Sequence, residues 1–171
     1  MRALALIPFL FAAGCGEAPS ENKAAPAAAA LAPGQWELAS EVTSFRKAGA
    51  GNAGTDTPVG TRATQSLCVG AGHELQTAFF AGDGYRCSYG TYYVRNGRVN
   101  LTMGCSREGL DGTITMAAEG TFQADSVEFR RNSNTSLTAG GTVAAEARVT
   151  GRRTGACAPD ANEGEGQNKQ G

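Results

Sequence analysis

The sequence contains few of the residues that enzymes most often use for catalysis, with a single histidine, His73, in 171 residues. It has no glycine-rich phosphate-binding loop and no serine nucleophile motif. It also has no basic block, and its 15 lysines and arginines nearly balance 16 aspartates and glutamates. Because nucleic-acid binding requires clustered positive charge, we exclude nucleic acid as a partner. We also expect no cofactor.

No two cysteines lie close together in the sequence. Zinc sites usually contain pairs of cysteines about two to four residues apart, and thiol redox motifs have two cysteines separated by about two residues. Neither spacing occurs among Cys15, Cys68, Cys87, Cys105 and Cys157. We therefore expect neither a metal site nor redox chemistry at these thiols.

The sequence also lacks an apolar run long enough to cross a membrane as a helix. The run over residues 3–13 has about eleven residues, against the roughly twenty that a span needs. It follows Arg2 and precedes small residues, which is the order of a secretory signal peptide. Residues 12–15 resemble the bacterial lipobox, in which the cysteine receives lipid. We predict a signal peptide over residues 1–14 and a Cys15 that carries diacylglycerol and palmitate.

The alternative is an ordinary signal peptide that is cleaved near Gly14 or Gly16. In the lipoprotein interpretation, the residue directly after the lipidated cysteine is Gly16 and not an aspartate. This choice resembles the signal that sorts lipoproteins to the outer membrane. We therefore predict an exported bacterial protein in the periplasm, anchored to the outer membrane by lipid. Residues 15–33 are expected to form a flexible Ala/Pro tether and residues 158–171 a disordered polar tail, since neither has a periodic apolar face.

The body of the chain, residues 34–157, alternates apolar and polar side chains, which indicates β-strands. The predicted strands include residues 35–45, 85–95, 98–106, 113–122, 127–129 and 143–149. The connections are too short for crossover helices, so the sheet is predicted to be antiparallel. Leu75, Ala78 and Phe79 have helical spacing and predict one short helix within residues 71–81. The fold class is therefore mainly β: a curved meander, sandwich or partly open barrel, with one short helix and disulfide bonds.

A hairpin is predicted around Arg95–Gly97, which separates two of these strands. A two-residue turn would place Cys87 opposite Ser106. A three-residue loop ending in a bulge at the glycine would place Cys87 opposite Cys105. We predict the three-residue loop because it allows a disulfide and collects apolar residues on one face. In this register Tyr92 points away from the core.

Four cysteines remain once Cys15 is assigned to lipid, and an even number in an exported chain favours disulfides. The hairpin register pairs Cys87 with Cys105 and leaves Cys68 to pair with Cys157. Each bridge is expected to contribute roughly 3–5 kcal/mol by restricting the unfolded chain.

Two sets of polar residues are candidates for catalysis. His73 with Glu74 or Asp83 could form an acid–base set, although a lone histidine near a predicted helix start is more often an exposed polar residue. Asp111, Glu119 and Glu128 could supply the paired carboxylates of a glycosidase. Glu119 and Glu128 fall at outward strand positions, however, where charges are solvated. We therefore predict that the protein is not an enzyme and has no catalytic residues.

Aromatic residues of the predicted strands could line a binding cleft, although such residues more often belong to a core. They are Trp36, Tyr85, Tyr89, Tyr92 and Tyr93. Because Tyr92 points away from the core in the predicted hairpin, Trp36 and Tyr92 are the candidates for a binding surface.

Several short motifs follow one another through the body of the chain. They are Leu31–Glu37, Cys68, Phe79–Phe80, Cys87, Gly97–Cys105, Gly120–Phe122 and Gly151–Cys157. With this order the chain resembles a family of small bacterial envelope proteins known as domain of unknown function 3617. The resemblance implies an envelope protein with a mixed sheet-and-helix fold, and it implies no activity and no catalytic residues.

Two functions are expected from these features. The first is a noncatalytic, lipid-anchored periplasmic domain that binds an envelope protein or a small ligand through its sheet. The alternative is a carrier that holds a small apolar ligand inside a closed β-barrel. Small inward side chains at Ala118, Gly120, Ala145 and Ala147 favour close packing over a large cavity, so the first function is preferred.

Overall fold

The structure is a computed structural model that describes residues 30–49, 57–72 and 74–158. The predicted signal peptide, Cys15, most of the predicted tether, His73 and nearly all of the predicted tail lie outside the described residues. No helix in the described ranges is long and apolar enough to cross a membrane.

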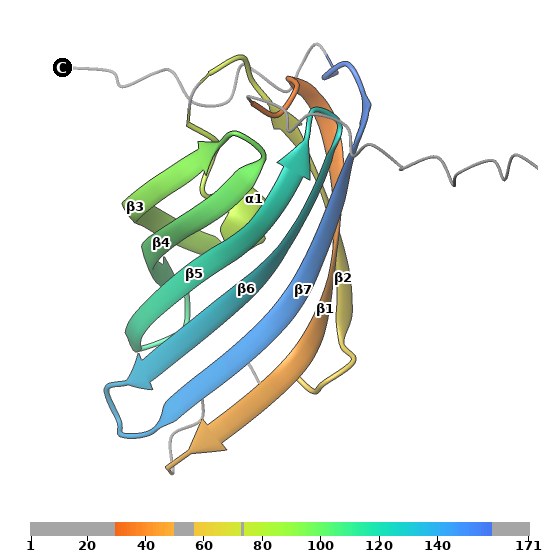
Figure 1. The fold of residues 1–171 in the computed structure, drawn as a ribbon. Helices are drawn as coiled ribbons and strands as arrows, with labels where there is room; N and C mark the ends of the chain where they lie inside the picture. The colour runs from red at the N-terminus through yellow and green to blue at the C-terminus, as the bar shows by residue number, and fades with distance from the viewer. Residues whose placement is uncertain (1–29, 50–56, 73, 159–171) are drawn as a thin grey trace, which may run out of the picture.

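Within the described residues, seven antiparallel strands form one curved sheet, and one short helix lies against it (Figure 1). The elements are β1 (Gly34–Ala48), β2 (Arg62–Val69), α1 (Ala78–Ala81), β3 (Tyr85–Arg95), β4 (Arg98–Arg107), β5 (Gly112–Gln123), β6 (Ser126–Leu137) and β7 (Thr142–Gly155). Strands β3 to β7 form a meander, β1 pairs with β7, and β2 pairs with β1 at the edge. The predicted fold class is confirmed.

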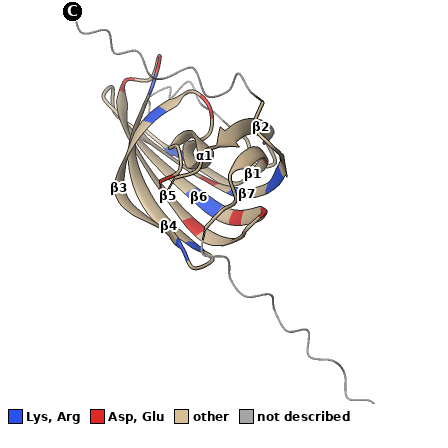
Figure 2. Ribbon diagram, turned by 90° about the horizontal axis from the view of Figure 1, so that it is seen from above, with Lys and Arg blue, Asp and Glu red and all other residues tan. Residues whose placement is uncertain are grey.

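The sheet curls into a half-barrel and does not close. Its edge strands, β2 and β3, do not pair with each other, and α1 lies on the concave side (Figure 2). The alternative of a closed barrel is therefore wrong. The sheet stays open because the chain between β2 and β3 passes over the concave side, where Phe79 and Phe80 of α1 fill the interior.

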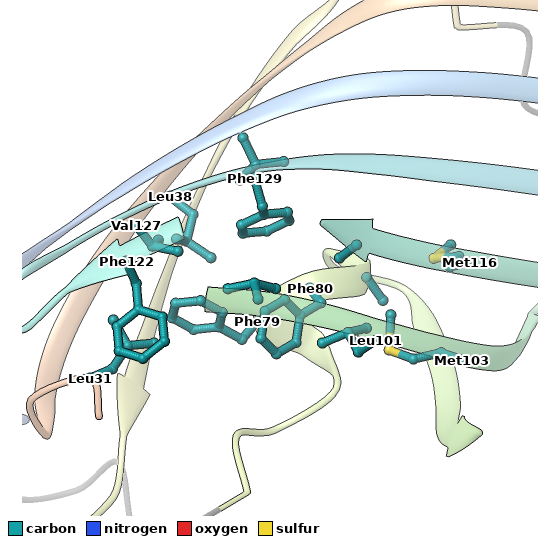
Figure 3. Close-up of a cluster of buried hydrophobic side chains, with 14 of the residues drawn as sticks. Leu31, Leu38, Phe79, Phe80, Leu101, Met103, Met116, Phe122, Val127 and Phe129 are labelled. Carbon is teal, nitrogen blue, oxygen red and sulfur yellow. The ribbon is translucent and has the colours of Figure 1, made fainter. Parts of the chain in front are cut away.

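The core lies between α1 and the concave face of the sheet (Figure 3). Phe79 and Phe80 are 1% and 0% exposed, although α1 has only four residues. The Phe80 ring lies 5.4 Å from the ring of Phe129 on β6, and the Phe79 ring lies 5.8 Å from that of Trp36 on β1. A helix this short is unstable alone in water, so these apolar contacts hold it in place.

The helix is shorter than the sequence predicts. Only Ala78–Ala81 are helical, and Gly82 ends the helix with a φ of 86°. Leu75, which has the correct spacing for the same helix face, lies before the helix and is held by tyrosine side chains. The short helix predicted within residues 71–81 is therefore confirmed at Ala78–Ala81, whereas Leu75 is not part of it, because its backbone bonds to tyrosines of β3.

The β3–β4 hairpin does not have the predicted loop. Asn96 and Gly97 form a two-residue turn, and Arg95 lies opposite Arg98. Both turn residues have positive φ angles, of 52° and 72°. A type I′ turn requires this conformation and matches the twist of paired strands, which explains why it forms in place of the predicted three-residue loop.

The extra residue lies instead at Gly90, in the middle of β3. A β-bulge there shifts the register by one residue and brings Cys87 opposite Cys105, with Cα atoms 4.1 Å apart. A glycine inside a strand often marks such a bulge. The shift also turns Tyr92 toward the concave face, opposite Leu101. The prediction that Tyr92 points away from the core is therefore wrong.

Both predicted disulfides are present, one near each edge of the half-barrel. Cys68–Cys157 joins edge strand β2 to the segment that follows β7, with Cα atoms 5.5 Å apart. Cys87–Cys105 joins β3 and β4 beside the core. Since β1 lies between β2 and β7, the first bridge fastens three neighbouring strands together.

Gly120 on β5 allows a close approach to β6. A Cβ atom added there would clash with the Glu128 carbonyl oxygen and lie 2.5 Å from the Phe129 Cα. We expect Gly120→Ala to lower the free energy of unfolding by about 1–3 kcal/mol, because an overpacked strand must shift its backbone. Guanidinium denaturation measures the change.

Gly104→Ala on β4 is the matched control. Nothing lies within 4 Å of a Cβ atom added there. Its free energy of unfolding is expected to stay unchanged or to rise by about 0.5 kcal/mol, since alanine restricts the unfolded chain. Equal stability of the two variants would contradict the packing assigned to Gly120.

Candidate ligand-binding site

A pocket of about 210 Å³ lies beside α1 on the concave side of the sheet. Part of its wall is apolar and is formed by Leu38, Phe79 and Val149. Polar residues complete the wall: Ser40, Thr64, Gln65, Asp83, Tyr85 and Arg131. These side chains come from β1, β2, β3, β6, β7, α1 and the segment that follows α1, so the pocket exists only in the folded half-barrel.

Larger hollows lie on the convex face, with volumes of about 360 and 580 Å³. Charged residues in the first of them already form ion pairs, with 2.6 Å between Arg148 and Glu128 and 4.0 Å between Arg130 and Glu146. Exposed ion pairs of this kind contribute little and leave little charge for a ligand. The second hollow has an exposed lining that includes Arg98, Asn100 and Glu119. The concave pocket borders the buried core and is therefore the candidate site.

Arg131 is the central charged residue of the pocket. It follows Val127 and Phe129 on the inward face of β6, where alternation along the strand places it. Its Nη1 donates to the carbonyl oxygens of Phe80 at 3.2 Å and Ala81 at 2.9 Å. These carbonyls end α1 and have no helical partner of their own. The end of α1 thus fixes the orientation of the guanidinium.

The rest of the Arg131 guanidinium is open to the pocket. No described residue accepts a hydrogen bond from its Nε or Nη2, and no described carboxylate lies within 4.0 Å of it. Burial lowers the pKa of Arg131 from its ordinary value, and Tyr85 raises it in part. An arginine still stays protonated at neutral pH. The pocket therefore contains a positive charge with free donors.

Gln65 links the edge strand β2 to α1 across one side of the pocket. Its Nε2 donates to Asp83 Oδ1 at 2.8 Å and to the Ala78 carbonyl oxygen at 3.3 Å. The carboxylate of Asp83 is thus held by an amide and forms no ion pair with Arg131. The lining contains one positive and one negative side chain, which are separated from each other.

Two tyrosines of β3 hold the segment that precedes α1. The Tyr89 hydroxyl donates to the Leu75 carbonyl oxygen at 2.7 Å, and the Tyr92 hydroxyl accepts from the Leu75 N–H at 2.9 Å. In a regular strand these tyrosines would face opposite sides, but the bulge at Gly90 places both on the concave face. Their hydrogen bonds fix the approach of the chain to α1.

The environment of this pair disfavours ionisation of both hydroxyls. Burial raises the pKa of Tyr89 from its ordinary value, and Tyr92 and Glu74 raise it further. Burial also raises the pKa of Tyr92. The hydrogen bond from the Leu75 N–H lowers this pKa, and the charge of Glu74 raises it. Both tyrosines therefore favour their neutral form in the folded protein more strongly than in the unfolded chain.

These shifts predict a loss of stability in base. A group whose pKa is higher in the folded state stabilises the fold fully below its unfolded pKa, here about 10, and this stabilisation is lost as the pH rises toward the folded value. We expect the free energy of unfolding to fall above about pH 10, and to fall less in Tyr89→Phe. Urea denaturation at several pH values measures this slope.

Tyr93→Phe is the control for this experiment, because Tyr93 lies on the opposite face of β3, where its ring lies beside Arg95. It should keep the pH dependence of the unaltered protein. An identical pH profile in Tyr89→Phe would contradict the role assigned to the buried hydroxyl.

The prediction that Trp36 and Tyr92 form a binding surface is wrong. Trp36 is 0% exposed, and its Nε1 donates to the Ala32 carbonyl oxygen at 3.0 Å. Tyr92 is half-buried against Leu75 and Tyr89, with 4.8 Å between the two tyrosine rings. Both side chains belong to the packing around α1, so Trp36 has no exposed surface and Tyr92 is only partly exposed.

The other candidate residues do not come together in one site. Glu119 and Glu128 are exposed on the convex face, at the outward positions that strand alternation predicts. Glu74 and Asp83 are also exposed, and His73 lies outside the described residues. In the part of the chain that the structure covers, no group of three His, Cys, Asp or Glu residues could hold a metal ion.

Sequence reasoning did not identify Arg131 or the pocket. The available signal was the position of Arg131 two residues after Phe129. Alternate residues of a strand share one face, so Arg131 lies on the same inward face as the core residues of β6. A charged residue at an inward position is uncommon and requires a polar partner. That partner, the end of α1, lies about 50 residues away in the sequence.

Comparison with known proteins places most of the chain in one family. Residues 31–157 match the model of a family described as protein of unknown function (DUF3617). The match includes every strand, α1 and all four cysteines of the two disulfides. No curated protein and no solved structure matches the chain.

Proposed function

The chain belongs to the DUF3617 family of proteins of unknown function, and from its pocket we propose that it is a noncatalytic ligand-binding domain of the bacterial envelope. In this proposal the protein is exported to the periplasm and anchored to the outer membrane by lipid on Cys15. The half-barrel holds a small ligand in the pocket beside α1, on the concave side of the sheet.

One observation carries the binding function, namely the guanidinium of Arg131 in a partly apolar pocket with no described carboxylate within 4.0 Å of it. Removing a charge from bulk water is costly unless partners replace its hydration. The carbonyl groups of α1 accept only from Nη1, and no buried side-chain nitrogen of the described residues lacks a partner, so Nε and Nη2 are accessible from the pocket. A ligand that accepts hydrogen bonds from Nε and Nη2 would complete the set of partners.

Two further features support the location. Residues 1–15 have the order of a bacterial lipoprotein signal, with a cysteine directly after small residues. The pairs Cys68–Cys157 and Cys87–Cys105 are placed for disulfides, which persist in oxidising compartments and are rare in the cytosol. A lipid anchor of several acyl chains would hold such a domain stably at a membrane.

A pocket-filling variant tests the binding function. Ser40 lines the pocket from β1, so Ser40→Phe would occupy much of its volume. Ser66→Phe is the matched control, because Ser66 is exposed on the neighbouring strand β2 and does not line the pocket. Thermal unfolding first establishes that both variants fold.

Native mass spectrometry of protein released gently from its own membranes then detects bound small molecules. We expect a noncovalent adduct on the unaltered protein and on Ser66→Phe, and its loss in Ser40→Phe. An adduct that persists in Ser40→Phe, or no adduct on any of the three proteins, would contradict ligand binding in this pocket.

A further inference from the structure

We infer that the ligand of the concave pocket is a small apolar carboxylic acid, bound as its carboxylate to Arg131. This inference rests on the proposed ligand-binding function and adds the chemical class of the ligand.

The donors of Arg131 determine the charge and shape of the polar group. Since Nη1 donates to Phe80 and Ala81, the free edge of the guanidinium is the one formed by Nε and Nη2. Two parallel N–H groups on a planar guanidinium match the two oxygens of a carboxylate. The fixed orientation of the guanidinium favours this geometry because little flexibility is lost when the ligand binds.

The other charged side chain of the lining limits the charge of the ligand. Asp83 carries a negative charge and forms no ion pair with Arg131. With one arginine and one aspartate, the pocket suits a single negative charge and disfavours a phosphate dianion or a diacid, which would place more negative charge near Asp83. A monocarboxylate is therefore preferred.

The volume and the apolar wall determine the remainder of the ligand. The pocket of about 210 Å³ is smaller than the roughly 300–1,000 Å³ of sites for drug-sized ligands. A dry cavity of about 150 Å³ in another protein holds benzene. Leu38, Phe79 and Val149 supply the apolar contacts. We therefore expect a ring or a short chain of about six to eight carbons attached to the carboxylate.

Benzoate is the probe, and benzamide is its neutral control of nearly the same shape. Both are titrated into the full mature chain with its disulfides intact, and binding is followed by calorimetry and by shifts of the NMR signals of Phe79 and Arg131. We expect benzoate to bind at least about tenfold more tightly than benzamide, because charge-assisted hydrogen bonds are stronger than neutral ones.

Three variants separate the role of Arg131 from effects on folding. Arg131→Gln is expected to reduce the benzoate-to-benzamide ratio to about one. Arg130→Gln, at the next position on the exposed face of β6, should keep the ratio of the unaltered protein. Ser40→Phe leaves Arg131 in place and should lose binding of both probes, so the test does not depend on whether Arg131→Gln folds.

The results that would overturn the inference are equal affinity for benzoate and benzamide, or benzoate binding that persists unchanged in Ser40→Phe. If the natural adduct is still lost in Ser40→Phe while benzoate shows no preference, the carboxylate assignment fails and the binding pocket stands. If neither the natural adduct nor the probes depend on Ser40, both proposals fail.

Discussion

Replacing Cys68 and Cys157 together by alanine is expected to lower the free energy of unfolding by about 4.6 kcal/mol. This bridge joins residues that are 89 positions apart in the sequence, so its removal frees a long loop in the unfolded chain. The second bridge joins residues 18 positions apart. Removing Cys87 and Cys105 is therefore expected to cost less, about 3 kcal/mol. Guanidinium denaturation without reductant measures both.

Losing both bridges is expected to unfold much of the protein, since domains of this size have a net stability of only about 5–15 kcal/mol. Reduction of the unaltered protein should give the same loss as replacing all four cysteines. The variant without these cysteines is the control, because a reductant should not change its stability. An unaltered protein whose denaturation midpoint does not move on reduction would contradict the presence of both bridges.

Phe80→Ala is expected to lower the free energy of unfolding by about 3–5 kcal/mol, because it opens a cavity in the centre of the core. Phe80 is 0% exposed, and its ring lies 5.1 Å from that of Phe79, 5.4 Å from that of Phe129 and 6.4 Å from that of Tyr89. Since α1 depends on these contacts, the variant should also loosen the helix and the pocket beside it.

Trp36 provides a second measurement of this variant, because it is the only tryptophan in the sequence and is fully buried beside Phe79. Its emission should move to longer wavelength if α1 detaches under native conditions. Val59→Ala is the control, since Val59 is 63% exposed and should change the stability by less than about 0.5 kcal/mol. A loss below about 1 kcal/mol in Phe80→Ala with unchanged emission would contradict the anchoring role of Phe80.

Sequence alone predicted six of the seven strands of the described residues, although it gave β6 only over residues 127–129 and did not identify β2. On β5, the alternation of Ile114, Met116 and Ala118 with exposed residues correctly identified both the strand and its buried face. Alternation is a local property that reports burial directly. The same alternation places Arg131 at an inward position on β6.

The hairpin shows how a correct pairing can follow from an incorrect turn. An extra residue in the turn, or anywhere on β3 between Cys87 and the turn, brings the two thiols into register, so the thiols alone cannot locate it. Asn96 and Gly97 are the preferred residues of a two-residue turn, and Gly90 interrupts a run of strand-forming residues. These two local signals together would have placed the bulge correctly and turned Tyr92 inward.

The helix and the pocket depend on contacts that no local pattern contains. The segment around Leu75 is held by hydroxyl groups of Tyr89 and Tyr92, 14 and 17 residues away. Arg131 meets the carbonyl groups of Phe80 and Ala81 only because the sheet curls around α1. The curvature of the sheet arises from the whole set of strands, and the binding site could therefore not be derived from the sequence.

Export, lipid attachment and disulfide formation can be tested together by measuring the intact mass of the chain extracted from membranes. We expect a polypeptide that begins at Cys15, carries the added mass of its acyl groups and gains about four daltons on reduction, since each of the two disulfides takes up two hydrogens. A chain without lipid, or a mass that reduction leaves unchanged, would contradict the proposal of an anchored, disulfide-bonded envelope domain.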